Sequence, residues 1–313
     1  MSSSVEAGAF SRDARAVSIG EYEIKPPLVK PSRLTRVEKG GVGKELSDGW
    51  AVNFAVGCTH ACPFCYADSI NRRFAPSRFG NVARNEWGMY LLTPANIEEA
   101  IEETPWEKWR GELVMMSSMH DPYLPQLYPI PRKILERALP AGVRFLIQTR
   151  SALFVKDLDL LARYGEQIIL QVSIATMSEW LAGAIEPRAP RPESRLRALK
   201  KAKEAGLKVG AIVAPVMPPN PLRENVEEDL ERLMKALADV GADQVFGEML
   251  HVRGGNMKRL ERILGARVEV RADEERALAS LFYAALERHG LKGEWWFESP
   301  RLLSLGAHVI HGL

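Results

Sequence analysis

Short apolar runs alternate with stretches of helical spacing along most of this chain, and that alternation limits the folds open to it. The apolar runs are rich in Val, Ile and Leu and are short enough for buried strands. Buried strands that alternate with helices favour a parallel sheet covered by helices, because each parallel connection must cross back over the sheet. We predict strands at residues 50–56, 112–117, 143–148, 167–174, 208–215 and 244–250.

Helical spacing appears between and after these strands, where crossover helices belong. Gly142, Gly206 and Gly241 each lie between a predicted helix and the next strand, where a left-handed helix cap suits glycine. No Gly-x-Gly-x-x-Gly follows a predicted strand, which disfavours a dinucleotide-binding sheet. We therefore predict an α/β fold with six β/α units, a partial or full TIM-like barrel. Helices are predicted at residues 67–74, 94–103, 131–139, 156–164, 192–205, 222–240 and 273–289.

The two ends of the chain lie outside this pattern. The first 48 residues show little periodicity, and Pro26 and Pro27 indicate an extended segment. We predict an N-terminal arm at residues 1–48, a barrel core at residues 49–252, and a C-terminal helical extension packed on the barrel at residues 253–313.

The composition is that of a globular chain. It has 313 residues, of which 46% are hydrophobic and 26% charged, so a sizeable core is available. The formal net charge of +2 neither requires nor excludes a nucleic-acid partner. No apolar run reaches the roughly 18 residues that a membrane span needs, and the N-terminus lacks the apolar stretch of a secretory signal. The sequence therefore predicts a cytoplasmic protein with no membrane partner.

The three cysteines, Cys58, Cys62 and Cys65, lie together in a loop between the first predicted strand and a predicted helix. An odd, clustered set is a poor disulfide framework and points to metal binding. In a β/α barrel such a loop lies at the active face, where the strands have their carboxyl ends. Three thiolates can hold three irons of a cubane cluster, and the fourth iron then stays open to the amine and carboxylate of a small molecule.

A structural zinc site is the alternative reading of this loop. Zinc usually takes four ligands, and His60 would complete a Cys₃His set. His60 lies between two of the cysteines, however, which makes simultaneous ligation sterically awkward. The iron–sulfur interpretation is therefore favoured.

The spacing Cys-x3-Cys-x2-Cys, with an aromatic residue before the last cysteine, resembles the signature of the radical S-adenosylmethionine (SAM) superfamily. More of the chain, from residue 57 to about residue 219, resembles the spore photoproduct lyase-like branch of that superfamily. The matching segments are Cys65-Tyr66-Ala67, Asp121-Pro122-Tyr123 with Pro125, Thr149-Arg150-Ser151, residues 157–161, Val172-Ser173-Ile174, Glu186-Pro187-Arg188-Ala189-Pro190, Ala205-Gly206 and residues 213–216.

This resemblance implies a β/α partial barrel that binds one [4Fe–4S] cluster and SAM. In the family the reduced cluster gives one electron to the SAM sulfonium, and a C–S bond breaks to form a 5′-deoxyadenosyl radical that abstracts hydrogen from a substrate. The resemblance therefore also implies a reducing partner such as ferredoxin or flavodoxin. The cofactors carry this chemistry, while the protein positions them and excludes other hydrogen donors.

The resemblance also implies cofactor contacts near the cysteine loop. Phe64 would pack near the adenine, and Tyr66 adjoins the last cysteine. Ser117, Ser118 and Asp121 follow the second predicted strand, where the family has groups that accept from the SAM amine. Ordinary packing and capping roles are the alternatives for these residues.

Four further residues are candidates for holding SAM. Arg150 ends the third predicted strand, where a cation with a bidentate fork suits the SAM carboxylate. Ser173 ends the fourth strand, within reach of the ribose or the carboxylate. Glu186 and Arg188 lie on a proline-rich loop that would orient SAM or close the barrel mouth. A surface ion pair for Arg150 and an ion pair fixing the loop are the alternatives.

His120, Tyr123 and Tyr128 follow the second strand near the expected mouth. A tyrosine can donate a hydrogen atom or relay a radical, so Tyr123 and His120 are the catalytic candidates. The resemblance departs from the lyase proper at one position, because the additional cysteine that returns a hydrogen atom there corresponds to Ser118. No fourth cysteine exists in this chain, so the repair activity itself is not inherited.

Two basic stretches bear on the substrate. Residues 188–208 hold eight Lys and Arg against two Glu, and residues 253–267 hold five basic residues against one Glu. Such stretches favour a nucleic-acid substrate slightly, and Trp295 and Trp296 are candidates for stacking on bases. A solvated helix face is the usual reading of a charge run, and a core position that of a Trp. The alternatives are a peptide, lipid or small-metabolite substrate, or a non-enzymatic binding protein that its metal stabilises.

Overall fold

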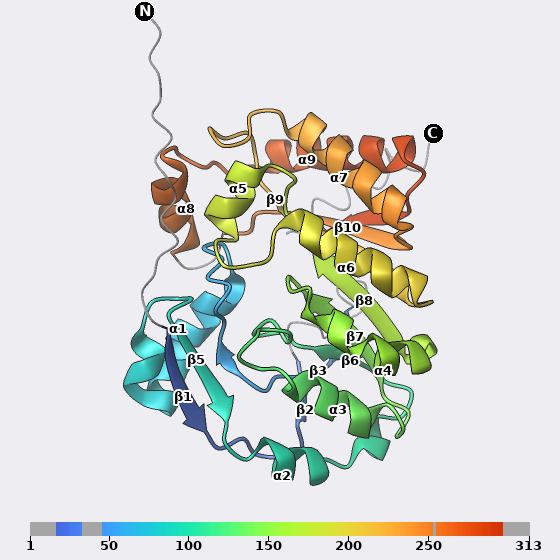
Figure 1. Cartoon of the computed structure of the whole chain (residues 1–313). Helices are drawn as coiled ribbons and strands as arrows, with labels where there is room; N and C mark the ends of the chain where they lie inside the picture. The colour runs from blue at the N-terminus through green and yellow to red at the C-terminus, as the bar shows by residue number, and fades with distance from the viewer. Residues whose placement is uncertain (1–16, 33–45, 253–254, 297–313) are drawn as a thin grey trace, which may run out of the picture.

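The main sheet has eight strands in the order β11-β10-β9-β8-β7-β6-β3-β2 (Figure 1). The computed structural model describes residues 17–32, 46–252 and 255–296. Every neighbouring pair in this sheet is parallel except β2 with β3. The strands are β2 (Val29–Pro31), β3 (Trp50–Val52), β6 (Leu113–Met116), β7 (Arg144–Thr149), β8 (Ile168–Ser173), β9 (Lys208–Val216), β10 (Gln244–Met249) and β11 (Gly293–Trp296).

The predicted α/β fold is confirmed, and each of the six predicted strands contributes a strand to the parallel part of this sheet. Their residues are buried in near-continuous runs, as in β9, where all but the first residue are buried. That pattern is typical of strands with a packed layer on both faces. The helices that follow the strands lie along the outside of the curved sheet (Figure 1).

The first predicted strand is wrong in its middle. It divides into β3 and β4 (Val56–Gly57), which belong to different sheets. The second sheet joins β1 (Ser18–Tyr22), β5 (Tyr90–Pro94) and β4 in the order β1-β5-β4. The chain leaves the main sheet at Asn53, whose side chain bonds the end of β6, and Gly57 adopts a φ of +91° beside Tyr90. The apolar sequence of residues 50–56 does not reveal the contacts of Asn53 with β6 or the close approach of Gly57 to Tyr90.

All seven predicted helices occur, and α5 and α8 were not predicted. The helices are α1 (Tyr66–Phe79), α2 (Ile97–Glu102), α3 (Ile130–Ala138), α4 (Leu158–Arg163), α5 (Glu179–Ile185), α6 (Pro192–Glu204), α7 (Val226–Val240), α8 (Asn256–Leu264) and α9 (Ala272–Arg288). Short 3₁₀ helices lie at Gly80–Arg84, Trp106–Trp109, Leu153–Asp157 and Gly165–Gln167. Gly142, Gly206 and Gly241 all have a positive φ, which confirms the predicted left-handed turns before β7, β9 and β10.

The last described strand, β11, extends the sheet beyond β10 and is covered by α9 (Figure 1). Trp295 is 1% exposed against Phe282 of α9, and Trp296 stacks on Phe246 with ring centroids 4.6 Å apart. The idea that these two Trp residues stack on bases is therefore wrong, because both rings lie in the core. Within the described residues, no helix is long and apolar enough to cross a membrane.

Gly247 on β10 leaves room for the rings of Trp295 and Phe282 to pack against the sheet. A Cβ at that position would lie 2.6 Å from Trp295 and 2.7 Å from Phe282. We expect Gly247→Ala to lower the free energy of unfolding by about 1–3 kcal/mol, because two buried rings would have to move. Urea denaturation measures this change.

Gly183→Ala is the matched control, since Gly183 lies inside α5 and a Cβ there meets nothing within 4 Å. Ala is the better helix former, so this variant should be unchanged or more stable by up to about 1 kcal/mol. Equal destabilisation of the two variants would contradict the packing argument.

Candidate active site

The cysteine loop runs from β4 to α1 at the carboxyl end of the parallel strands. Cys58 and Cys62 are buried, while Cys65 is half-buried and precedes the first residue of α1. The loop turns at Ala61, which has a φ of +60°. Gly88 packs against this turn so closely that a Cβ on it would lie 2.2 Å from the Ala61 Cβ. The tight turn brings the three cysteines to one cavity.

That cavity has a volume of about 130 Å³. One side is formed by the cysteine loop and the other by polar residues that end β6, β7 and β8. Ten of the predicted site residues line it, namely Cys58, Cys62, Cys65, Tyr66, Ser117, Ser118, His120, Asp121, Arg150 and Ser173. Residues that the sequence analysis did not single out also line it, among them Trp87, Met115, Gln148 and Thr149.

The donor set suits an iron–sulfur cluster. All three thiols border one cavity, and thiolates that bind separate irons of a cubane do not have to converge on one point. Among the described residues, no three His, Cys, Asp or Glu side chains do converge in that way. His60, the proposed fourth zinc ligand, instead has its Nε2 atom 3.2 Å from Asp121 Oδ2. Burial raises the pKa of the Cys58 thiol to about 12, so metal binding must displace its proton.

Asn53 organises the end of β6. Its Oδ1 atom accepts hydrogen bonds from Ser117 Oγ at 2.7 Å, from the Ser118 amide at 3.0 Å and from the Met119 amide at 3.1 Å. The Tyr66 hydroxyl donates to the Ser118 carbonyl at 2.5 Å and so ties α1 to the same turn. The sequence analysis missed Asn53, because a single Asn inside an apolar run gives no indication of its partners.

Asp121 joins the β6 turn to the end of β7. Its Oδ1 atom accepts from Thr149 Oγ1 at 2.7 Å and from the Tyr123 amide at 2.9 Å, and its Oδ2 atom accepts from the Arg150 amide at 2.6 Å. Burial alone would raise the pKa of Asp121, but His60 and these hydrogen bonds outweigh burial and lower the pKa to about 2. The carboxylate therefore stays ionised and fixes the strand end that carries Arg150.

Arg150 lies at the centre of a buried charge network. Its Nε atom donates to Glu186 Oε1 at 2.8 Å, and its Nη2 atom donates to the Ala214 carbonyl at 2.9 Å. Its guanidinium carbon lies 5.1 Å from the centre of the Phe64 ring, which places a cation over the cysteine loop. Glu186 in turn pairs with Arg195, which also donates to the Ser173 carbonyl. The network thus connects the cysteine loop to β8 and β9.

Arg195 is a site residue, and the prediction that the basic residues of 188–208 contact phosphates is wrong for it. It is 1% exposed and faces Glu186. Burial would raise the pKa of Glu186, whereas Arg195 and Arg150 lower it and keep the carboxylate ionised. Helical spacing could have indicated that Arg195 is buried, because it falls between Pro192 and Leu199 on the apolar side of α6.

A family model described as the radical SAM superfamily matches residues 52–233, more than half of the chain. The chain belongs to the radical SAM superfamily. It is therefore an enzyme of that superfamily, and membership implies an iron–sulfur cluster and SAM. An uncharacterized protein of Acidianus two-tailed virus, ORF301, is 63% identical over 92% of this chain and 96% of its own length. An uncharacterized protein of Mycobacterium bovis is 28% identical over 66% of this chain and 59% of its own length.

Solved radical SAM structures share this fold. Spore photoproduct lyase in complex with dinucleoside spore photoproduct has a TM-score of 0.60 and 18% identity, over 80% of this chain and 76% of its own. SuiB of Streptococcus suis bound to S-adenosylmethionine has a TM-score of 0.51 and 14% identity, over 80% of this chain and 50% of its own. The predicted resemblance to a lyase-like radical SAM barrel is confirmed at the level of the fold.

Four predicted site residues do not line the cysteine cavity, namely Phe64, Tyr123, Glu186 and Arg188. Tyr123 is fully buried, and its hydroxyl donates to Asp157 at 3.0 Å, so it does not reach the cavity. Tyr128 donates to the same carboxylate at 3.1 Å. Arg188 lines a neighbouring cavity of about 680 Å³ and donates to the Gly88 carbonyl at 2.8 Å. The structure gives these tyrosines a packing role rather than access to a radical.

His120 does line the cavity, but both of its ring nitrogens have backbone partners. Its Nε2 atom accepts from the Phe54 and Ala55 amides at 3.1 Å, and its Nδ1 atom lies 3.1 Å from the Asp121 carbonyl. Burial lowers the pKa of His120 to about 4, so the ring is neutral near pH 7. The catalytic role predicted for His120 gains no support from these contacts and stays a prediction.

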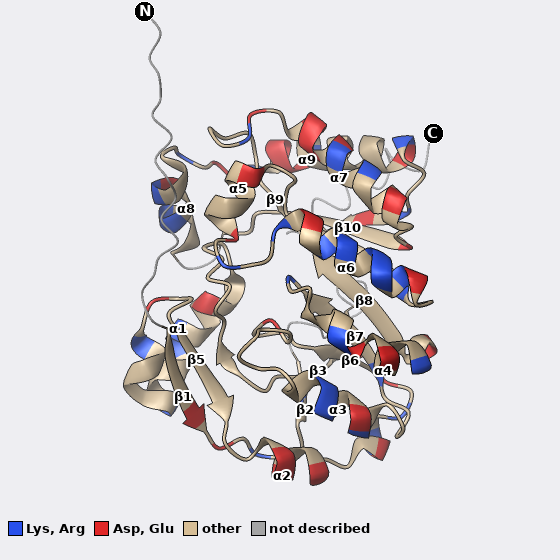
Figure 2. Cartoon of the chain, in the orientation of Figure 1, with Lys and Arg blue, Asp and Glu red and all other residues tan. Residues whose placement is uncertain are grey.

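Several Lys and Arg residues of the two basic stretches form ion pairs within the protein. Lys203 pairs with Asp243 and Lys208 pairs with Glu166. Arg259 pairs with Asp68, while Arg253 lies outside the described residues. The remaining exposed positive charge gathers on α6 and α8 (Figure 2).

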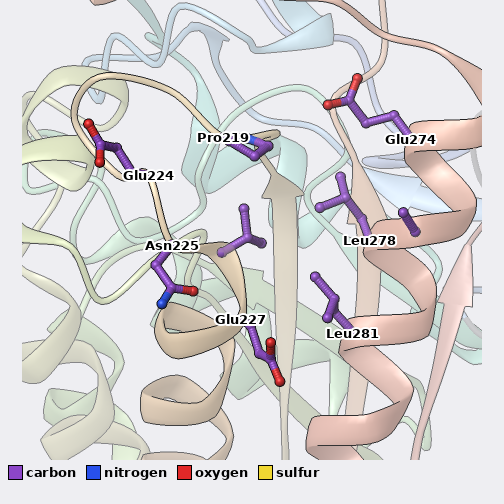
Figure 3. A pocket seen from close by; sticks show the side chains of 9 residues that line it. Pro219, Glu224, Asn225, Glu227, Glu274, Leu278 and Leu281 are labelled. Atoms are coloured by element: carbon purple, nitrogen blue, oxygen red, sulfur yellow. The ribbon is translucent and has the colours of Figure 1, made fainter.

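Another cavity, of about 560 Å³, lies between the N-terminal parts of α7 and α9 (Figure 3). It combines the carboxylates of Glu224, Glu227 and Glu274 with apolar side chains such as Leu278 and Leu281. None of the three cysteines lines it. The cavity is separate from the radical SAM site and would repel anionic ligands.

We expect Asp121→Asn to lower the free energy of unfolding at pH 7 by about 2 kcal/mol, because the folded protein favours the ionised carboxylate. A carboxyl group with a lowered folded pKa stabilises the fold above its unfolded pKa, and this stabilisation disappears as the pH falls through the folded pKa. The difference from the wild type should therefore shrink between pH values of about 4 and 2. Urea denaturation across that range measures it.

Glu166→Gln is the control, since Glu166 lies on the surface with Lys208. It should change stability by less than about 1 kcal/mol. A destabilisation by Asp121→Asn that is the same at every pH would contradict the ionised role of Asp121.

Proposed function

We propose that Cys58, Cys62 and Cys65 hold a [4Fe–4S] cluster beside a bound SAM, and that the resulting 5′-deoxyadenosyl radical abstracts hydrogen from a substrate. One observation carries this proposal: the three thiols face the polar ends of β6, β7 and β8 across a single cavity. Three thiolates leave one iron of a cubane without a protein ligand, which suits chelation by SAM. The bound cluster supplies one electron to the sulfonium, whose bond to C5′ breaks.

Arg150 would hold the SAM carboxylate. It lines the cavity, and its guanidinium is fixed by Glu186, by the Ala214 carbonyl and by the Phe64 ring. A fixed, planar cation loses little entropy when it binds a carboxylate. Ser173, whose carbonyl is held by Arg195, would meet the same ligand from the end of β8.

The hydroxyl oxygens of Ser117 and Ser118 would accept from the SAM amine. Asn53 holds both side chains, with Asn53 Nδ2 donating to Ser118 Oγ at 3.1 Å and Ser117 Oγ donating to Asn53 Oδ1. Since both serines line the cavity, their orientation is set before a ligand arrives.

The neighbouring cavity of about 680 Å³ would hold the substrate. His60 lines both cavities, so the two spaces are neighbours at the cysteine loop. The size is that of an ordinary ligand pocket. Arg188 lines it, and the exposed Arg197 lies within one helical turn of its lining residue Ser194, while the exposed Arg191 pairs with Glu179 at 2.7 Å. This positive charge favours an anionic substrate such as nucleic acid over an apolar metabolite.

We expect anaerobically purified protein to be brown, to contain about four irons and to cleave SAM to 5′-deoxyadenosine under dithionite. Cys62→Ala should lose both the iron and the cleavage. Iron analysis and chromatography of the products measure these outcomes. Colourless protein that holds one zinc and cleaves no SAM would reject the proposal.

Arg150→Ala should weaken SAM binding at least about tenfold, equivalent to about 1.4 kcal/mol, because a charge-assisted pair is lost. The iron content should stay that of the wild type, since Arg150 is not a ligand. Arg137→Ala, which removes an exposed partner of Glu102, is the control and should leave SAM binding unchanged. Unchanged SAM affinity in Arg150→Ala would remove Arg150 from the binding site.

The nucleic-acid preference has its own measurement. An oligonucleotide should bind with an affinity that falls as the salt concentration rises, because each phosphate contact releases counterions. Arg191→Ala combined with Arg197→Ala should flatten that dependence. Absence of binding, or binding that salt does not weaken, would favour a peptide or small-metabolite substrate.

A further inference from the structure

Helices α1 and α8 form a basic surface beside the cysteine loop. Five exposed basic side chains lie on these two helices: Arg72, Arg73, Arg78, Lys258 and Arg262. Their two acidic residues are Asp68, which is buried, and Glu261, which is half-buried. Figure 2 shows the Lys and Arg residues of both helices on the same side of the molecule. We call this the α1–α8 surface.

Direct contacts join the two helices to each other and to the cysteine loop. Arg259 of α8 donates through Nη2 to the Pro63 carbonyl at 3.0 Å, and it pairs with Asp68 of α1. Arg72 pairs with the same carboxylate at 2.8 Å. Pro63 lies between two of the cysteines, so the α1–α8 surface is attached to the loop that would bind the cluster.

The same surface lies nearest to the most accessible cysteine. Cys65 is half-buried and directly precedes α1, whereas Cys58 and Cys62 are buried at 8% and 5% exposure. A cluster held by Cys65 would therefore lie directly beside the first turn of α1. Exposed apolar groups accompany the charges there, since Phe74 is 58% exposed with Arg73 over its ring, and Ile263 is 37% exposed.

We propose that the α1–α8 surface is the docking site of an acidic electron-carrier protein that reduces the cluster. This inference rests on the proposed function, because it presupposes a cluster at the cysteines. Positive charge around an apolar centre complements a carrier with an acidic rim around its redox group, and it speeds productive encounter. One electron leaves the reduced carrier and enters the cluster, and no proton or covalent bond changes in that step.

The substrate side of the molecule is different. The cavity proposed for the substrate is lined by His60 of the cysteine loop, by residues of the β6–α3 and β7–α4 connections, and by the loop before α6 with its first turn, not by α1 or α8. A carrier docked on the α1–α8 surface would therefore leave that cavity open. Reduction and substrate binding can then occur together.

The test compares two reductants on a charge-reversed variant, Arg73→Glu with Lys258→Glu and Arg262→Glu. The assay measures 5′-deoxyadenosine formation without substrate. With an acidic flavodoxin as the reductant, the rate at low ionic strength should fall at least about tenfold, because attraction becomes repulsion. With dithionite, a small molecule that needs no docking surface, the rate should match that of the wild type.

A control variant carries equal charge reversal elsewhere, at Arg232, Lys235 and Arg276 on α7 and α9. Its rate should match that of the wild type with both reductants. The neutral variant Arg73→Gln with Lys258→Gln and Arg262→Gln should show a smaller loss with flavodoxin. In the wild type, the flavodoxin-driven rate should also fall as the salt concentration rises, while the dithionite-driven rate should not.

Three results would overturn the docking proposal. The first is a flavodoxin-driven rate that the charge reversal leaves unchanged, and the second is an equal loss with both reductants. The third is loss of oligonucleotide binding with unchanged reduction, which would assign the surface to nucleic acid. Absence of SAM cleavage with dithionite in the wild type would instead reject the proposed function, so the two failures are distinguishable.

Discussion

The buried carboxylate of Glu186, held between Arg150 and Arg195, is the interaction on which the rest of the site depends. Burying one charge alone would be prohibitive, and two opposite charges fixed by hydrogen bonds make the burial tolerable. The network spans four parts of the chain, since Arg195 reaches the Ser173 carbonyl and Arg150 reaches both the Ala214 carbonyl and the Phe64 ring. The cavity therefore has a rigid charged wall opposite the thiols.

The polar residues at the strand ends are fixed by a second set of contacts, which meets this network at the Arg150 backbone. Asn53 gathers three donors at the end of β6, and Asp121 ties the same turn to the end of β7. Since the side chains that would meet SAM are already held, little conformational entropy remains to be lost on binding. A site with a radical intermediate benefits from such rigidity, because a mobile side chain is also a hydrogen donor.

The sequence predicted the framework well and the network poorly, for a physical reason. Apolar periodicity is repeated along a whole element, so the strands and crossover helices could be placed from the sequence. The spacing of the three cysteines likewise predicted a metal site. Asn53 and Arg195 act through single contacts that depend on the fold, and residue type alone cannot reveal them. Arg195 led to a wrong prediction of phosphate contact, because a sequence does not distinguish a buried Arg from a phosphate-binding one. The candidates that followed the strand ends, such as Arg150 and Ser173, reached the cavity because parallel strands end together.

The proposed SAM cleavage would be followed by chemistry that differs from that of the lyase that the chain resembles. All three cysteines line one cavity, and the resemblance puts Ser118 where the lyase has its additional cysteine. The Ser118 hydroxyl is engaged by Asn53, and its strong O–H bond makes it a poor hydrogen-atom donor. Tyr123 cannot replace it, because its hydroxyl is bound to Asp157 away from the cavity. A product radical formed by the proposed chemistry would therefore have to regain hydrogen from 5′-deoxyadenosine, gain an electron from a carrier, or eliminate a group.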